Sequence, residues 1–238
     1  MLHCTGLLPS PPAMHASPVP VTSGLPDVPK NIGNPDLIPA DGWGMLGNRD
    51  CGDCGIAGPM HTEMYWAAVA GKPVRFTDLD AKQDYGALTG YPLHDPGIDM
   101  MRGGSYWQHV GFRDATATRH KIVAYRSIEG SFWSRPNLQH VLLCTSLFGA
   151  TGIGVRLPDS VATQFGYNKI WEPVSGAKDT KEYHFVAVLF RCDGLIGIIS
   201  WGRLCWMTES FFEKYCLEAT AYLRDANDPH AGLFKAAA

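Results

Sequence analysis

Charge is scarce in this sequence, and it is not clustered. Charged side chains make up 18% of the 238 residues, the net charge is -3, and no run of five or more basic residues occurs. A surface that follows nucleic-acid phosphates needs clustered Lys and Arg, so the sequence excludes nucleic acid as a partner. The longest apolar stretch, Phe185 to Trp201, is interrupted by Arg191 and Asp193 well short of a membrane span. Residues 1–8 have neither a basic start nor a long apolar run, so we expect no signal peptide, transmembrane segment or membrane partner.

Cysteines are few and do not form a ligand set. Seven are present, an odd number in a chain long enough to be stable without disulfides, which favours a reducing compartment. Cys51 and Cys54 form a C-x-x-C, but no second close pair supplies the other two ligands of a zinc site. A redox motif is normally preceded by a strand, whereas residues 41–47 form a loop punctuated by glycine. We therefore expect no metal and no cofactor, and a redox protein is only a distant alternative.

Three segments follow from the distribution of proline and charge. Residues 1–40 carry 9 of the 17 prolines and three charged residues, a composition that predicts an extended arm. Residues 41–225 form the folded domain, and residues 226–238 form a C-terminal tail. An arm without a core of its own becomes ordered only on its own domain or on a neighbouring chain, so it points to an assembly partner.

The domain is predicted to be α+β, with helices first and antiparallel strands later. Apolar residues recur at helical spacing in four segments, namely 56–70, 79–88 with Asp78 as cap, 97–110 and 137–148. Strand-like runs cover 121–128, 152–157, 183–191, 195–201 and 218–223, and Thr208 caps a further helix that ends near residue 217. Asp193-Gly194 suits a hairpin turn between the third and fourth of these strands.

Cys54 is the first candidate for chemistry. It ends the turn-rich loop 47–55 that leads into the first predicted helix. Free N–H groups and the helix dipole at such a position favour an anion and lower the pKa of a thiol toward neutrality. Cys54 is therefore a candidate nucleophile, the alternative being a buried and inert thiol. Pro59 removes an N–H early in the segment and predicts that the helix begins later than Cys54.

A thiolate nucleophile needs a base, and His184 is the best placed of nine histidines. It opens an apolar strand, and the predicted hairpin brings residues 200–202 back beside it. The alternative is a structural histidine at the strand edge. His61 lies two helical turns beyond Cys54, too far for a hydrogen bond with it.

Together these residues resemble the papain-like cysteine peptidases. The family's Gln-x-x-Cys-Gly-Ser-Cys is similar to residues 48–54, and its Asn-Ser-Trp-Gly is similar to residues 199–202. The resemblance implies a central helix headed by Cys54 as nucleophile, followed by an antiparallel sheet lobe that carries His184. It implies that Asn48 helps to stabilise the oxyanion, that Trp201 shields the histidine, and that Cys51 matches a cysteine that is disulfide-bonded in many secreted members.

The sequence departs from this pattern at the residue that orients the histidine. Alignment on Trp201 places Ile199 where the family has Asn, whereas counting from His184 places Ser200 there. Ile cannot hydrogen-bond an imidazole, so Ser200 or a backbone carbonyl must hold the ring, or the ring is poorly oriented. Asn48 is also one methylene shorter than Gln.

A second resemblance covers most of residues 41–223. The segments 43–48, 52–54, 148–149, 200–202 and 207–208 resemble papain-like proteins encoded by tailed bacteriophages and prophages. This implies a protein of the virion or host cytoplasm whose arm contacts other virion subunits. We predict a thiol peptidase or amidase that acts on a peptide substrate. The alternative is a non-catalytic head decoration, head-to-tail or tail component that uses the fold as a scaffold.

Overall fold

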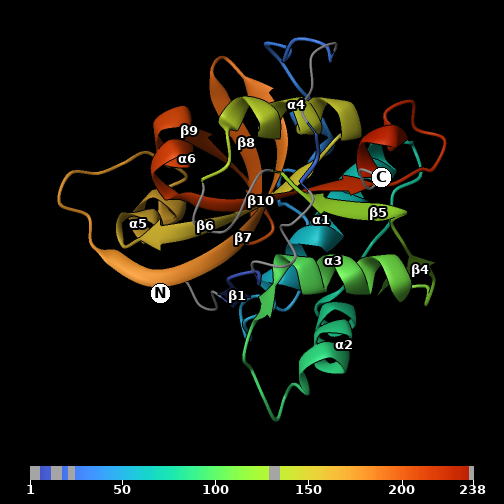
Figure 1. Cartoon of the computed structure of the whole chain (residues 1–238). Helices are drawn as coiled ribbons and strands as arrows, with labels where there is room; N and C mark the ends of the chain where they lie inside the picture. The colour runs from blue at the N-terminus through green and yellow to red at the C-terminus, as the bar shows by residue number, and fades with distance from the viewer. Residues whose placement is uncertain (1–5, 12–17, 21–24, 129–134, 236–238) are drawn as a thin grey trace.

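The structure, a computed structural model, describes residues 6–11, 18–20, 25–128 and 135–235. Helices α1, α2 and α3 pack on one side of a six-stranded antiparallel sheet, and α4 and α6 lie near its other face (Figure 1). The helices are α1 (Cys54–Val69), α2 (Asp78–Thr89), α3 (Met100–His109), α4 (Leu138–Phe148), α5 (Ser160–Gly166) and α6 (Glu209–Tyr215). This α+β architecture agrees with the prediction from sequence.

The sheet has the strand order β5-β10-β6-β7-β8-β9, and all of its pairs are antiparallel. Its strands are β5 (Ala124–Ser127), β6 (Thr151–Pro158), β7 (Asp179–Cys192), β8 (Leu195–Ser200), β9 (Arg203–Thr208) and β10 (Cys216–Leu223). Two short pairs lie outside it: β1 (Leu7–Leu8) with β2 (Ile98–Asp99), and β3 (Phe112–Arg113) with β4 (Arg119–His120). Asp193 and Gly194 both have positive φ, 50° and 78°, so the predicted hairpin turn between β7 and β8 is confirmed.

The central strand β7 divides the core in two. Phe185, Ala187 and Leu189 belong to the cluster on the side of α1, whereas Val186 and Val188 belong to the cluster on the side of α4 and α6. Successive side chains of a strand point to opposite faces, and both faces here are covered. This explains why residues 185–190 form a continuous apolar run in the sequence. His184 lies at the point where this run begins.

Helix α1 is buried almost throughout its length, as expected for an element that is apolar on all sides. It begins at Cys54, so the prediction that Pro59 delays the start is wrong. Proline removes one intrahelical hydrogen bond, and the burial of this helix outweighs that loss.

Several other boundaries differ from prediction. The cap of α2 is Thr77, which accepts from the backbone N–H of Asp80 in a capping box, and not Asp78. Helix α3 begins at Met100 and not at residue 97, and α6 ends at Tyr215 because β10 begins at the next residue. Strand β9, helix α5 and the short strands β1 to β4 were not predicted from the sequence.

The described parts of the arm lie on the chain's own domain. Leu7 and Leu8 pair with β2, the N–H of Val19 donates to the carbonyl of Ser127 at 2.8 Å, and Ile32 exchanges two backbone hydrogen bonds with Arg191. These contacts all lie within one chain, and contact with a neighbouring subunit stays a prediction. No helix within the described ranges is long and apolar enough to cross a membrane.

Candidate active site

Cys54 is placed by the start of α1 and by the middle strand of the sheet. Its side chain is 1% exposed, and its Sγ accepts the backbone N–H of Phe185 at 3.5 Å. Phe185 follows His184 on β7, so this contact brings the thiol next to the histidine although 130 positions separate them in the chain. The predicted nucleophile and the predicted base therefore share one small cavity.

His184 is held on two sides. Its Nε2 lies 3.0 Å from the hydroxyl of Ser200, and its ring stacks on Trp201 with 4.3 Å between centroids and 13° between planes. Its Nδ1 is buried and has no hydrogen-bond partner among the described residues. Because Nε2 contacts Ser200, Nδ1 is the ring nitrogen that can form a hydrogen bond with the thiol.

The register of β7 and β8 decides which residue orients the histidine. Ala187 lies opposite Ile199, and a bulge at 188–190 shifts the pairing beyond it. Ser200 thus reaches the His184 ring, whereas Ile199 is 1% exposed and belongs to the core cluster on the α1 side. Of the two residues that the alignments offered, Ser200 and not Ile199 contacts the His184 ring.

Asn48 lies in the same cavity and is 2% exposed. Its amide donates to the carbonyl of Cys51 at 3.4 Å. Cys51 carries a free, buried thiol whose Sγ lies 3.6 Å from the carbonyl of Gly47, so the disulfide implied by the resemblance is not seen among the described residues. The loop before the nucleophile is therefore held by internal hydrogen bonds.

Asp53 is a site residue that the sequence analysis missed. It occupies the N-cap of α1, is fully buried, and makes no capping hydrogen bond with its side chain. Burial holds its pKa well above the ordinary range, and the nearby Asn48 amide and Cys51 thiol oppose this shift only in part. An ionised Asp53 beside Cys54 raises the pKa of the thiol. The signal in the sequence was an acidic residue directly before the candidate nucleophile.

His61, which the sequence analysis set aside, also lines the cavity. Its Nε2–H donates to the carbonyl of Gly44 at 2.9 Å, and its ring stacks on Trp43. These two contacts hold the loop 41–47 against the cavity. Met45 from the same loop lies against the cavity as well.

The arm covers the other side of the site. Gly6 packs so closely that an added Cβ would lie 1.8 Å from the carbonyl oxygen of Gly52. The backbone N–H of Gly6 also acts on the Cys54 thiol and opposes part of the rise in its pKa. The thiol therefore faces a hydrogen-bond donor of the arm.

Tyr85 and Asp95 hold the two walls between which Gly6 lies. Asp95 accepts the Tyr85 hydroxyl at 2.6 Å and the N–H of Gly52 at 3.0 Å, and Tyr85 accepts the N–H of Gly97 at 2.9 Å. A Cβ at Gly97, where φ is +80°, would lie 2.1 Å from the Gly6 carbonyl. The groove is narrow here because glycine backbones approach each other directly.

The cavity at Cys54 and His184 has almost no free volume. The cavity shared by Cys54 and His184 has a volume of about 10 Å³. A single water molecule needs about 10–15 Å³, so no peptide fits until the cover moves.

Burial also sets the protonation states in this covered form. It raises the pKa of the Cys54 thiol to about 11, against the opposing hydrogen bonds from Phe185 and Gly6, and it lowers the pKa of His184 to about 3. The predicted lowering of the thiol pKa is therefore wrong for this state, because desolvation outweighs the helix terminus. Both groups are neutral near pH 7.

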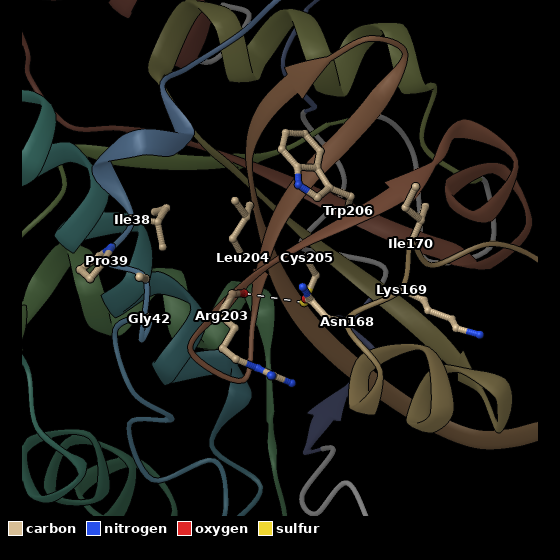
Figure 2. A pocket seen from close by; sticks show the side chains of 11 residues that line it. Ile38, Pro39, Gly42, Asn168, Lys169, Ile170, Arg203, Leu204, Cys205 and Trp206 are labelled. Carbon is tan, nitrogen blue, oxygen red and sulfur yellow. Dashed lines mark hydrogen bonds between the residues drawn. The ribbon is translucent and has the colours of Figure 1, made fainter.

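A second pocket lies beside the site and does not contain it. A cavity of about 440 Å³ lies between residues 38–42 and β9, and Arg203 and Lys169 are among the residues that line it (Figure 2). Neither Cys54 nor His184 lines this cavity.

Comparison with known proteins identifies the fold. Xylellain, a cysteine protease from Xylella fastidiosa, superposes with a TM-score of 0.68 at 12% identity, covering 94% of this chain and 97% of that one. The fold is that of the papain-like cysteine proteases. Procathepsin B S9 from Trypanosoma congolense gives 0.67 at 10% identity, covering 93% and 87%. Digestive procathepsin L2 from Tenebrio molitor larval midgut gives 0.61 at 13% identity, covering 93% and 78%. No family model and no curated protein sequence matches the chain. At these identities the likeness establishes the papain-like fold and not the activity.

Proposed function

We propose that this chain is a thiol hydrolase that cleaves peptide or amide bonds. The observation that carries the proposal is the pairing of Cys54, at the start of the central helix, with a histidine held by Ser200. In the reaction His184 Nδ1 takes the thiol proton while Sγ attacks the substrate carbonyl. The backbone N–H of Cys54 and the Asn48 amide stabilise the oxyanion.

The remaining steps of the proposed reaction use only the side chains of the site and water. His184 returns the proton to the leaving amine as the carbon–nitrogen bond breaks, which leaves an acyl thioester on Cys54. Water, deprotonated by the same imidazole, then hydrolyses the thioester and restores the thiol. Ser200 orients the ring in both steps, and Trp201 shields its contact with Ser200.

Activity requires that the arm leave the groove. Removing Gly6 and Leu7 from above Cys54 returns water to the thiol and to His184, which reverses the desolvation that keeps both neutral. The uncovered pair can then exchange a proton near neutral pH. The described structure is thus the covered, inactive form of the proposed enzyme.

The deciding experiment compares the chain with its Cys54→Ala variant, using iodoacetamide labelling and hydrolysis of a peptide library. We expect Cys54 to react faster than a free thiol once the arm is displaced, and the variant to lose activity by a factor on the order of 10⁴ or more. Equal hydrolysis by the two proteins would refute the proposal.

A second candidate is a structural role in a bacteriophage particle, with the papain-like fold as scaffold. The closed site and neutral thiol favour it, because a scaffold has no need of an accessible nucleophile. Deletion of residues 1–40 should then abolish incorporation into the particle while the domain stays folded. Normal incorporation of the truncated chain would count against this role.

A further inference from the structure

His61 belongs to the cavity that Cys54 shares with His184, although the reaction above does not use it. Helix α1 lines this cavity with residues at the spacing i, i+3, i+4 and i+7, namely Cys54, Ala57, Gly58 and His61. This spacing places them on one face of the helix. His61 lies about 10 Å from Cys54 along the helix axis, so it influences the site through a neighbour and not through the thiol itself.

The neighbour of His61 is the backbone carbonyl of Gly44. The Nε2 atom of His61 lies 2.9 Å from the Gly44 oxygen. Burial lowers the pKa of the His61 ring to about 4, so near pH 7 the ring is neutral and has one N–H, which Nε2 donates to this carbonyl. His61 is 2% exposed, and its buried N–H therefore depends on Gly44 for a partner.

The turn that follows Gly44 carries the proposed oxyanion donor. The N–H of Asn48 donates to the carbonyl of Met45 at 3.1 Å, which closes a turn over residues 45–48. Met45 and Asn48, the two ends of this turn, both line the cavity. Inside the turn φ is positive at Leu46 (51°) and Gly47 (88°). A left-handed conformation is unfavourable for leucine, so the turn persists only where other contacts hold it.

These contacts lie at both ends of the turn. At one end the N–H of Gly47 donates to a carboxylate oxygen of Asp78 at 3.1 Å. At the other end the Gly44 carbonyl accepts from His61, and it packs so closely on the next hairpin that a Cβ on Gly202 would lie 2.0 Å from its oxygen. The position of Gly44 therefore depends on the N–H of His61.

We propose that His61 is a positioning residue for the oxyanion site, because it holds the turn 45–48 that keeps the Asn48 amide beside Cys54. This inference rests on the proposed function. Loss of the His61 N–H frees Gly44, and the turn then relaxes and carries Asn48 away from the position that the oxyanion needs. A misplacement of about 1 Å costs on the order of 100-fold in rate. The loss falls on the transition state, so kcat decreases while KM stays nearly constant.

The test uses the full chain with Leu7→Ser, which removes a buried anchor of the arm and so uncovers Cys54. In this chain His61→Leu has no donor, and we expect kcat for a peptide substrate to fall about 10- to 100-fold with KM within about 3-fold. His61→Gln can still donate to Gly44 and should keep kcat within a few-fold. Iodoacetamide should label Cys54 at the same rate in all three chains, because alkylation forms no oxyanion.

A double-mutant cycle separates the positioning of Asn48 from a general loss of packing. Asn48→Ala removes the amide, so the addition of His61→Leu should lower kcat by less than about 3-fold more. Thr62→Val is the matched control, because it removes a buried hydrogen bond within the same helix, from the Thr62 hydroxyl to the Gly58 carbonyl. This control should leave kcat within a few-fold of the starting chain.

Hydrogen exchange provides a measurement that needs no catalysis. The Asn48 N–H should exchange about 10-fold faster or more in His61→Leu, and at its original rate in His61→Gln. Unchanged exchange, a loss of kcat that adds fully to that of Asn48→Ala, or an equal loss in the labelling rate would overturn the role of His61 and leave the hydrolase intact. If the Leu7→Ser chain shows no hydrolysis that depends on Cys54, the hydrolase is refuted, and the oxyanion role of His61 with it.

Discussion

At the scale of single residues, a hydroxyl contacts the histidine where the resemblance implied an amide. Ser200 is buried and binds His184 Nε2, so it meets the need for an orienting group. A hydroxyl can accept from this nitrogen or donate to it, whereas a carboxylate only accepts. Ser200 therefore positions the ring without fixing its charge.

Substitution of Ser200 by Thr and by Val separates the hydroxyl from the volume of the side chain. Ser200→Val leaves a buried Nε2 without a partner, and we expect kcat/KM to fall about 10- to 100-fold. Thr has nearly the same shape as Val but keeps the hydroxyl, so the Ser200→Thr variant should retain most of the activity. The pH profile of kcat/KM should shift in the Val variant alone. If both variants lose activity equally, the hydroxyl is not what orients His184.

At the scale of elements, α1 reaches the sheet because it has a glycine where it meets Phe185. A Cβ on Gly58 would lie 2.0 Å from Phe185 Cδ1. Phe185 also donates its N–H to the Cys54 thiol. The same contact therefore determines both the packing of the lobes and the position of the nucleophile.

Gly58→Ala should force α1 away from β7. We expect a loss of about 1–3 kcal/mol in the free energy of unfolding, measured by urea denaturation, because overpacking outweighs the gain in helix propensity. Gly166, at the end of α5, has no atom within 4 Å of an added Cβ, so Gly166→Ala is the matched control. A Gly58→Ala protein as stable as the control would contradict this account of the packing.

The strand β1 controls access to the thiol through one of its two faces. Leu7→Ser removes a buried anchor and should release the arm, which raises the rate at which iodoacetamide labels Cys54. Leu8→Ser changes a largely exposed side chain of the same strand and should leave the rate unchanged. Equal labelling of the two variants would mean that the arm does not cover Cys54 in solution.

At the scale of the whole molecule, the closed site makes folding sensitive to acid. Burial lowers the pKa of His61 to about 4, below its ordinary value of 6.5. Above pH 6.5 neither the folded nor the unfolded chain binds this proton. Between pH 6.5 and 4 only the unfolded chain binds it, so stability falls as the pH falls.

Comparison with His61→Gln isolates this contribution, because the other titrating groups are common to both proteins. A Gln amide can still donate to the Gly44 carbonyl. The stability of the unmodified chain relative to the variant should decrease by on the order of 3 kcal/mol between pH 7.5 and 4, measured by denaturant unfolding. The exposed His94→Gln should show no such trend. A pH-independent difference for His61→Gln would show that this histidine is not buried neutral.

The sequence by itself determined the α+β class, most element positions and the pair of Cys54 with His184. Local patterns carry this information: an apolar run of strand length, an Asp-Gly turn and a cysteine at the entrance to a helix. The tertiary structure decided which residue orients the histidine, because that depends on the register and bulge between β7 and β8. It also decided the protonation states, since burial in the folded molecule reverses the pKa shift that a helix terminus predicts. Contacts between segments far apart in the chain leave no periodic signal, so the cover over Cys54 appears only in the folded molecule.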